Sequence, residues 1–159
     1  MHVINDPAKW EYEMYKYIGK FKNIDPNFRI CITSQSSKQC MSFNHDRRKK
    51  HPELKIKMLT GTHSGITKTV YFEDIKNTLE PCDVFIFSPV IESGVDITIP
   101  MQKIYGVMSA QSNSQRAFLQ MIVRRRKVEE PVITLYTMTG SCRYMTATTP
   151  GHTKMCIKH

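Results

Sequence analysis

The feature that most constrains this chain is a continuous apolar run, Val84-Phe85-Ile86-Phe87. Such a run is typical of a strand buried on both faces, as in a parallel sheet covered by helices. Pro89 stops further pairing because it has no N–H to donate. Glu92, Gly94 and Asp96 follow shortly after. Open α/β sheets bind ligands just beyond the carboxyl ends of their strands, so we predict that these residues belong to a functional site.

Apolar segments of strand length alternate with amphipathic segments of helix length along the chain. We predict further strands at residues 30–32, 54–58, 103–108 and 132–136, and helices at 7–21, around 40–50, at 72–79 and around 117–122. This alternation predicts an α/β fold with a single doubly wound, mostly parallel sheet flanked by helices. We expect residues 1–23 to form an N-terminal amphipathic helix, 24–137 the sheet domain, and 138–159 a poorly ordered tail.

Small and polar residues follow three of the predicted strands. Ser34-Gln35 follows the first of them, Thr60-Gly61 the second, and the segment from Ser88 to Asp96 the third. Right-handed crossovers bring the loops after parallel strands to one edge of the sheet. We therefore expect these three loops to converge and to form the functional surface.

The chain is basic, with a formal net charge of +9. This charge suggests a polyanionic partner, although a solubilising surface explains it equally well. The basic run at residues 47–50 has two similar explanations, a phosphate-binding face or a solvated helix end. No apolar run approaches the roughly 18 residues of a spanning helix, so no membrane partner is expected. Five scattered cysteines favour reduced thiols in an intracellular compartment, the nucleus or the cytoplasm.

No residues are expected to bind a metal ion. The cysteines and histidines between residues 142 and 159 match no common zinc spacing. His45, His51 and His63 have no acid or nucleophile at an informative spacing, and we expect them on the surface.

A second set of chemistry-bearing residues lies near the end of the predicted helix at residues 117–122. Gln120 and Arg124 are four residues apart and so share a helix face, and Arg126 follows them. An arginine presents a rigid fork of donors that matches phosphate oxygens and keeps its charge. The alternative is a solvated basic helix end, which the helix macrodipole favours.

The order of these parts resembles the second RecA-like domain of superfamily 2 helicases over roughly residues 24–137. Ile30–Ser34 resembles motif IV, Met58–Gly61 resembles the next strand with its small-residue loop, and Phe87–Ile97 resembles motif V. Gln120–Arg126 resembles motif VI in its Gln-x-x-Gly-Arg-x-Arg form, with Val123 in place of the usual glycine. Together with the strand at 104–108, this form is most similar to the replication-origin-binding helicases of herpesviruses and their relatives.

The resemblance implies specific roles. Gly94 and Asp96, with Glu92, would bind the nucleotide, and Asp96 would lie near the ribose. Arg124 and Arg126 would act as arginine fingers, with Gln120 as their partner in catalysis. Contacts to the nucleic-acid backbone, through hydroxyls and neighbouring amides, would come from Ser34, Gln35, Thr60, Gly61 and Ser88.

The implied function is the C-terminal motor half of an ATP-dependent DNA helicase of the origin-binding type, acting in replication on single-stranded or origin DNA. The chain has no G-x-x-x-x-G-K-[ST] motif and no Asp-Glu box. We therefore expect ATP and Mg²⁺ to be held mainly by a separate N-terminal RecA-like domain, and this chain alone to be inactive. Two alternatives stay open, a non-catalytic nucleic-acid-binding module or remnant, and an unrelated doubly wound nucleotide-binding enzyme. A viral replication site would also fit the expected localisation.

Overall fold

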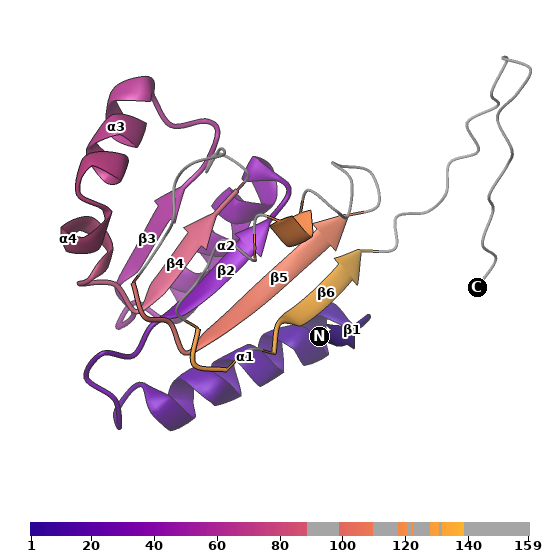
Figure 1. The fold of residues 1–159 in the computed structure, drawn as a ribbon. Helices are drawn as coiled ribbons and strands as arrows, with labels where there is room; N and C mark the ends of the chain where they lie inside the picture. The colour runs from indigo at the N-terminus through magenta and orange to yellow at the C-terminus, as the bar shows by residue number, and fades with distance from the viewer. Residues whose placement is uncertain (89–98, 110–117, 121, 123–127, 131, 139–159) are drawn as a thin grey trace, which may run out of the picture.

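A single parallel sheet forms the centre of the computed structural model, which describes residues 1–88, 99–109, 118–120, 122, 128–130 and 132–138. Within these residues, six strands pair in the order β1-β6-β5-β2-β4-β3, and every neighbouring pair is parallel (Figure 1). The strands are β1 (His2–Ile4), β2 (Ile30–Ser34), β3 (Ile56–Leu59), β4 (Val84–Phe87), β5 (Lys103–Ser109) and β6 (Thr134–Met138). Along the chain, β3 and β4 are added on one side of β2, and β5 and β6 are added on its other side. This change of side confirms the predicted doubly wound α/β fold.

The apolar run of β4 lies deep in the sheet, as its composition predicts. Every residue of β4 and of its neighbour β2 is buried. β4 pairs with β2 on one side and with β3 on the other, so both of its edges are hydrogen-bonded. Burial of both faces and both edges explains why this strand carries no polar residue.

Helices cover both faces of the sheet. On one face, α1 (Pro7–Phe21) and α2 (Ser37–Lys50) bury Trp10, Met14, Ile18 and Cys40 against the strands. On the other face lie Leu79 of α4 (Ile75–Leu79) and the helical residues Phe118 and Ile122, while α3 (Gly65–Glu73) precedes α4. No helix in the described part of the chain combines the length and the apolar character needed to cross a bilayer.

Close packing on the second face depends on Gly106 in the middle of β5. A Cβ atom at this position would lie 2.9 Å from a methyl group of Leu135 and 3.2 Å from the ring of Phe118. The missing side chain therefore lets the helix that contains Phe118 approach the strand closely.

The N-terminal segment is more closely integrated than the predicted separate helix. Asp6 caps α1 by accepting hydrogen bonds from the amides of Ala8 and Lys9, as its position before Pro7 predicts. Three residues ahead of the cap form β1, which pairs with β6 and was not predicted. Residues 1–23 thus supply both an edge strand and part of a covering layer.

Two other boundaries differ from the predicted ones. The predicted helix at 72–79 is divided into α3 and α4, because Asp74 leaves the helical conformation and its side chain caps Asn77. The last strand occupies Thr134–Met138 rather than 132–136, and its final residue pairs with Ser109. The remainder of the predicted tail, residues 139–159, lies outside the described residues.

Arg47 corrects the interpretation of the basic run at residues 47–50. Its side chain is fully buried between α1 and α2, with the guanidinium 4.9 Å from the ring centre of Phe43 and 5.5 Å from that of Tyr15. Glu11 pairs with it at 3.7 Å. Burial lowers the pKa of Arg47, and Tyr15 and Glu11 oppose that shift. This arginine therefore joins two helices and is closed to any phosphate.

Candidate nucleic-acid interface at the carboxyl edge of the sheet

The three polar loops that the sequence analysis singles out come together in the structure. Thr33 of β2 and Leu59 of β3 are both in register with Phe87 of β4. The residues that follow each strand, beginning with Ser34, Thr60 and Ser88, consequently lie at one edge of the sheet. The first residues of the three loops therefore lie together, while residues 89–98 of the third loop lie outside the described residues.

Ser88 connects this edge across three elements. Its hydroxyl accepts a hydrogen bond from the Gly61 amide at 3.2 Å and lies 3.2 Å from the hydroxyl of Ser37 at the start of α2. Its own amide donates to the Leu59 carbonyl at 3.1 Å. The end of β4 is thereby tied both to the loop after β3 and to the first turn of α2.

The loop after β2 is fixed by its own side chains. The Ser34 hydroxyl donates to Gln39 and accepts from the Ser36 amide at 3.2 Å. Ser36 is the N-cap of α2, and its hydroxyl accepts from the Gln39 amide at 3.4 Å. Gln35 accepts from the Ser109 amide at 3.1 Å, which links this loop to the end of β5. The amino terminus of α2 is therefore held firmly at the candidate interface.

The loop after β3 closes into a compact turn. The amide of Thr60 donates to Nδ1 of His63 at 3.0 Å, and the amide of His63 donates to the Thr60 carbonyl at 3.2 Å. The hydroxyls of Thr60 and Thr62 lie 2.7 Å apart, and the Thr62 hydroxyl lies 3.8 Å from the sulfur of Met41 on α2. This turn is thus fastened at both ends and rests against α2.

The predicted nucleic-acid ligands divide into buried and exposed groups. Ser34 and Thr60 are 0% exposed and Ser88 is 1% exposed, so their hydroxyls are engaged inside the protein. Gln35 is also buried, whereas Gly61 is exposed, as is Lys38 in the first turn of α2. A ligand at this edge would therefore meet the exposed backbone and side chains that the buried hydroxyls hold in position.

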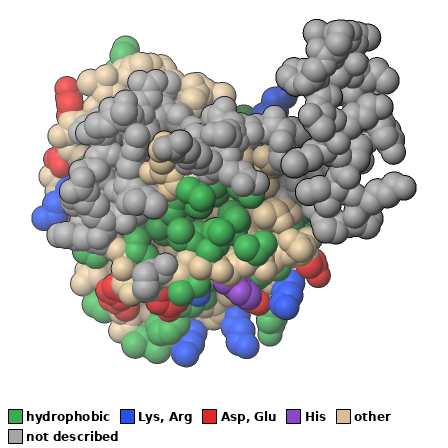
Figure 2. Space-filling model, turned by 45° about the vertical axis from the view of Figure 1, so that its right-hand side comes forward, with side chains coloured by type: hydrophobic (Ala, Val, Ile, Leu, Met, Phe, Trp, Pro, Cys, Tyr) green, Lys and Arg blue, Asp and Glu red, His purple; other side chains and the backbone are tan. Residues whose placement is uncertain are grey.

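The charge of this edge is favourable to an anion. The sequence has no acidic residue between Asp25 and Asp46, and none between Glu53 and Glu73, so the loops at residues 34–38 and 60–66 carry no carboxylate. Elsewhere the signs are mixed. Figure 2 shows hydrophobic side chains in the middle of one face, with basic and acidic side chains interspersed below them, where α1 runs in Figure 1. The absence of carboxylates is thus a property of these two loops, since the segment that follows β4 contains Glu92 and Asp96.

The predicted nucleotide-binding and catalytic residues fall into two groups. Glu92, Gly94, Asp96, Arg124 and Arg126 lie outside the described residues, and their roles stay predictions. Gln120 is described, and its side chain is exposed on a helical segment whose residues Phe118 and Ile122 are buried. Its orientation toward solvent leaves it free to meet a ligand or a partner domain.

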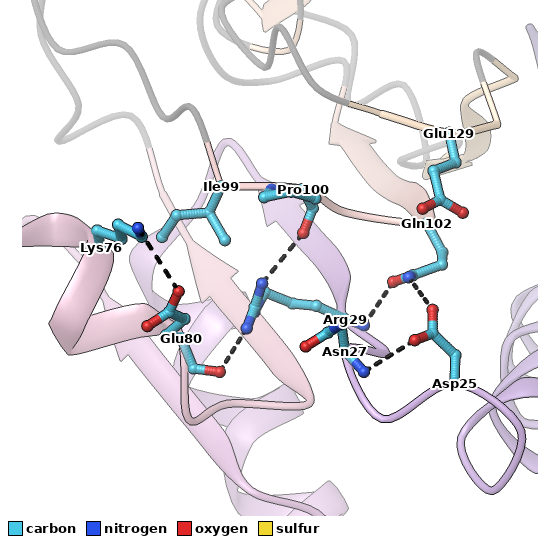
Figure 3. Close-up of a pocket in the computed structure, with 9 residues that line it drawn as sticks. All are labelled: Asp25, Asn27, Arg29, Lys76, Glu80, Ile99, Pro100, Gln102 and Glu129. Atoms are coloured by element: carbon cyan, nitrogen blue, oxygen red, sulfur yellow. Dashed lines mark hydrogen bonds and ion pairs between the residues drawn. The ribbon is translucent and has the colours of Figure 1, made fainter.

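A polar cavity of about 600 Å³ at the opposite, amino edge of the sheet was not predicted from the sequence. Figure 3 shows the guanidinium of Arg29 donating to the carbonyls of Pro100 and Glu80. It also donates to the carbonyl of Cys82. Gln102 joins the two sides by accepting from the Arg29 amide and donating to Asp25 at 2.6 Å. These contacts join residues that are far apart in the sequence, so no local sequence pattern predicts them.

Neither edge brings together a metal-binding group in the described part of the chain, where no three His, Cys, Asp or Glu side chains are arranged to hold an ion. Cys31, Cys40 and Cys82 are buried and form no disulfide with one another. Burial raises the pKa of Cys40 to about 12, so this thiol is protonated and unreactive at neutral pH.

Comparisons with known proteins find similarity in structure alone. No protein-family model matches the chain, and no curated protein sequence matches it. Domain 2 of the DEAD-box helicase Mss116p, solved bound to an RNA duplex, superposes with a TM-score of 0.63 at 14% identity, over 86% of this chain and 52% of that one. The chain thus spans about half the length of that structure.

Two further solved structures also superpose on this chain. The C-terminal domain of the DEAD-box protein Dbp5 gives a TM-score of 0.56 at 12% identity over 89% of this chain and 75% of that one. The Hef helicase domain of Pyrococcus furiosus gives 0.54 at 15% identity over 84% of this chain and 26% of that one. With its all-parallel sheet and flanking helices, the chain has the fold of the C-terminal RecA-like domains of superfamily 2 helicases.

Proposed function

We propose that this chain is the second RecA-like half of a superfamily 2 helicase-type motor and that its carboxyl edge forms part of a nucleic-acid track. The observation that carries this proposal is that Ser88, at the end of β4, joins the loops after β2 and β3, neither of which contains a carboxylate. The fold supports the proposal, since the structures it resembles are helicase domains.

The edge is suited to holding a phosphate backbone without reading bases. The α2 helix begins at this edge, and its macrodipole gives that end a partial positive charge. Lys38 in the same turn adds a full positive charge, and Gly61 lets a ligand approach the backbone closely because it has no side chain. Contacts of this kind position a strand but carry no sequence information, as a translocating motor requires.

The nucleotide side of the proposal rests on the motif resemblance. Arg124 and Arg126 would stabilise negative charge on a transferring phosphoryl group, with Gln120 beside them, and Glu92, Gly94 and Asp96 would contact the nucleotide. ATP and Mg²⁺ would be held mainly by an N-terminal RecA-like domain that carries the Walker residues. Action on replication origins is a narrower proposal, supported by the form of Gln120–Arg126 together with the strand at 104–108.

Direct binding measurements test the proposal. We expect the chain to bind fluorescently labelled single strands without ATP, with an affinity that falls as salt is raised because phosphate contacts release counterions. Parallel titrations with DNA, RNA and duplexes would identify the preferred ligand. Absence of salt-sensitive binding to all of them would contradict the proposed track.

A non-catalytic nucleic-acid-binding module is the second candidate, favoured by the absence of Walker motifs in this sequence. The two candidates differ in the role of Arg124 and Arg126. When a Walker-bearing RecA-like domain is supplied, the motor proposal predicts ATP hydrolysis that Arg124→Ala or Arg126→Ala reduces by a factor of 10³ or more. ATP hydrolysis that neither substitution reduces would favour the non-catalytic module.

A further inference from the structure

We propose that His63 is a further nucleic-acid contact and that it donates its Nε2–H to a phosphate oxygen of the backbone. This inference deepens the proposed function and rests on it. In the sequence, His63 has no acid or nucleophile at an informative spacing and is expected to be an ordinary surface histidine. The structure gives it a defined hydrogen-bonding role.

The hydrogen bonds around His63 fix the position of its ring proton. The amide of Thr60 lies 3.0 Å from Nδ1, and a backbone N–H can only donate, whereas the Thr60 carbonyl lies farther from the same nitrogen, at 3.3 Å, and can only accept. The shorter contact favours Nδ1 as the acceptor. The neutral imidazole carries one proton, which therefore resides on Nε2. The Thr60 hydroxyl, 3.1 Å from Nδ1, can donate to the same atom. The turn thereby selects the tautomer that presents a donor on the far side of the ring.

The position of the turn brings this donor to the candidate interface. Ser88 binds the turn through the Gly61 amide, and Met41 of α2 contacts it through Thr62. His63 is half-buried, and no described residue accepts a hydrogen bond from its Nε2. A ring whose Nδ1 is held by the turn, and whose Nε2 has no acceptor among the described residues, is preorganised for a ligand.

Phosphate is the ligand chemistry that this donor fits. The surrounding sequence from Leu54 to Phe72 has no carboxylate to compete for the N–H, and Lys38 lies at the start of the adjoining α2. A neutral donor gains strength from an anionic acceptor, since charge-assisted hydrogen bonds are about twice as strong as neutral ones. A phosphate contact also needs no base sequence, in agreement with a motor track.

Two substitutions of His63 distinguish the acceptor role of Nδ1 from the donor role of Nε2. In His63→Asn, the amide oxygen takes the place of Nδ1 and keeps the acceptor for Thr60, but nothing replaces Nε2. In His63→Gln, the longer side chain can carry an N–H to the position of Nε2, but its geometry no longer suits the acceptor role. The pair therefore removes the outward donor and the inward acceptor one at a time.

Binding of a labelled single-stranded oligonucleotide, read by fluorescence anisotropy, tests the proposal. We expect His63→Asn to keep the wild-type melting temperature and to bind roughly five- to tenfold more weakly. His63→Gln should keep more of the affinity despite a lower melting temperature. Wild-type affinity in His63→Asn, or an equal loss of affinity in both variants, would overturn the proposal.

A measurement without nucleic acid distinguishes failure of this inference from failure of the proposed function. The ¹⁵N chemical shifts of the His63 ring report which nitrogen carries the proton, and titration with inorganic phosphate reports whether Nε2 responds. We expect an Nε2–H tautomer whose Nε2 signal shifts with phosphate. An Nδ1–H tautomer, or no response of Nε2, would overturn the inference. Wild-type protein that binds no oligonucleotide would contradict the proposed function.

Discussion

The two edges of the sheet are built from different chemistry. At the amino edge, charged side chains fasten the protein to itself. Arg29 donates to three backbone carbonyls, and Glu130 accepts from Tyr17 at 2.8 Å and pairs with Lys103 at 3.0 Å. At the carboxyl edge, small hydroxyl groups such as Ser88 make the connections, and the loops at 34–38 and 60–66 contain no carboxylate.

This difference indicates that the amino edge stabilises the fold, whereas the carboxyl edge is suited to binding an anion. Carboxylates at the amino edge neutralise the basic side chains there, so that edge offers little to an anion. At the carboxyl edge, the connections are made by neutral groups, and the positive end of α2 and Lys38 stay available. The comparison predicts that substitutions at the amino edge change unfolding and that those at the carboxyl edge also change binding.

The largest effect is expected from Arg29→Met. This substitution keeps an apolar stem but removes the donors that satisfy the carbonyls of Cys82, Pro100 and Glu80. Each orphaned carbonyl costs about 1 kcal/mol or more, so we expect the free energy of unfolding in urea to fall by about 3 kcal/mol. Nucleic-acid affinity of the folded variant should not change. A loss of affinity at temperatures where the variant is fully folded would break the comparison.

Ser88→Ala should give an intermediate effect of both kinds. It removes the acceptor of the Gly61 amide and the contact with Ser37, which we expect to cost about 1–2 kcal/mol in unfolding free energy. Affinity for single strands should fall several-fold, because the loops that it connects would lose their fixed positions. Ser88→Thr retains the hydroxyl and is the matched control. A variant that loses stability and binds normally would assign Ser88 to folding alone.

A matched pair of lysines gives a smaller and more selective effect. Lys38 lies at the carboxyl edge, and Lys76, beside Glu80, lies at the amino edge, and both are exposed. We expect Lys38→Ala to weaken binding about two- to threefold and to reduce the salt dependence by about one phosphate contact. Lys76→Ala should change neither quantity. Equal effects of the two substitutions on affinity would contradict the proposed division between the edges.

The smallest effect concerns the pH dependence of the amino edge. Burial raises the pKa of Glu130, but the hydrogen bond from Tyr17 and the pairing with Lys103 outweigh it and hold the pKa below its ordinary value. A carboxyl group whose pKa is lowered by folding stabilises the fold at pH values above its pKa in the unfolded chain, about 4.3. That stabilisation is lost as the pH falls through its pKa in the folded chain.

The melting temperature should therefore fall slightly more between pH 7 and pH 3 in the wild type than in Glu130→Gln. The corresponding difference in the free energy of unfolding should stay below about 1 kcal/mol, since the pair is partly exposed. Parallel curves for the two proteins would show that Glu130 does not contribute to the acid sensitivity of this edge.

The parts of the fold that sequence patterns predict are those with strong local signals. The apolar run of β4 and the Asp6-Pro7 start of α1 are read directly from the chain, and both are confirmed. β1 was missed because an exposed edge strand of three residues has no buried pattern. The burial of Arg47 depends on the packing of α1 against α2, which a basic run cannot reveal.

The candidate site was predictable in its location but not in its detail. Parallel topology is sufficient to bring the loops after β2, β3 and β4 together, whereas the inward orientation of the Ser34, Thr60 and Ser88 hydroxyls depends on contacts between loops. The tautomer of His63 likewise follows from a single backbone amide that no spacing rule identifies.

The most direct test of the division between the edges is a map of amide chemical shifts during titration of the ¹⁵N-labelled chain with a short single-stranded oligonucleotide. We predict shifts concentrated at residues 35–38 and 60–64, at the carboxyl edge. Shifts concentrated around Arg29, Lys76 and Gln102, or no saturable shifts at all, would contradict the assignment of nucleic-acid binding to the carboxyl edge.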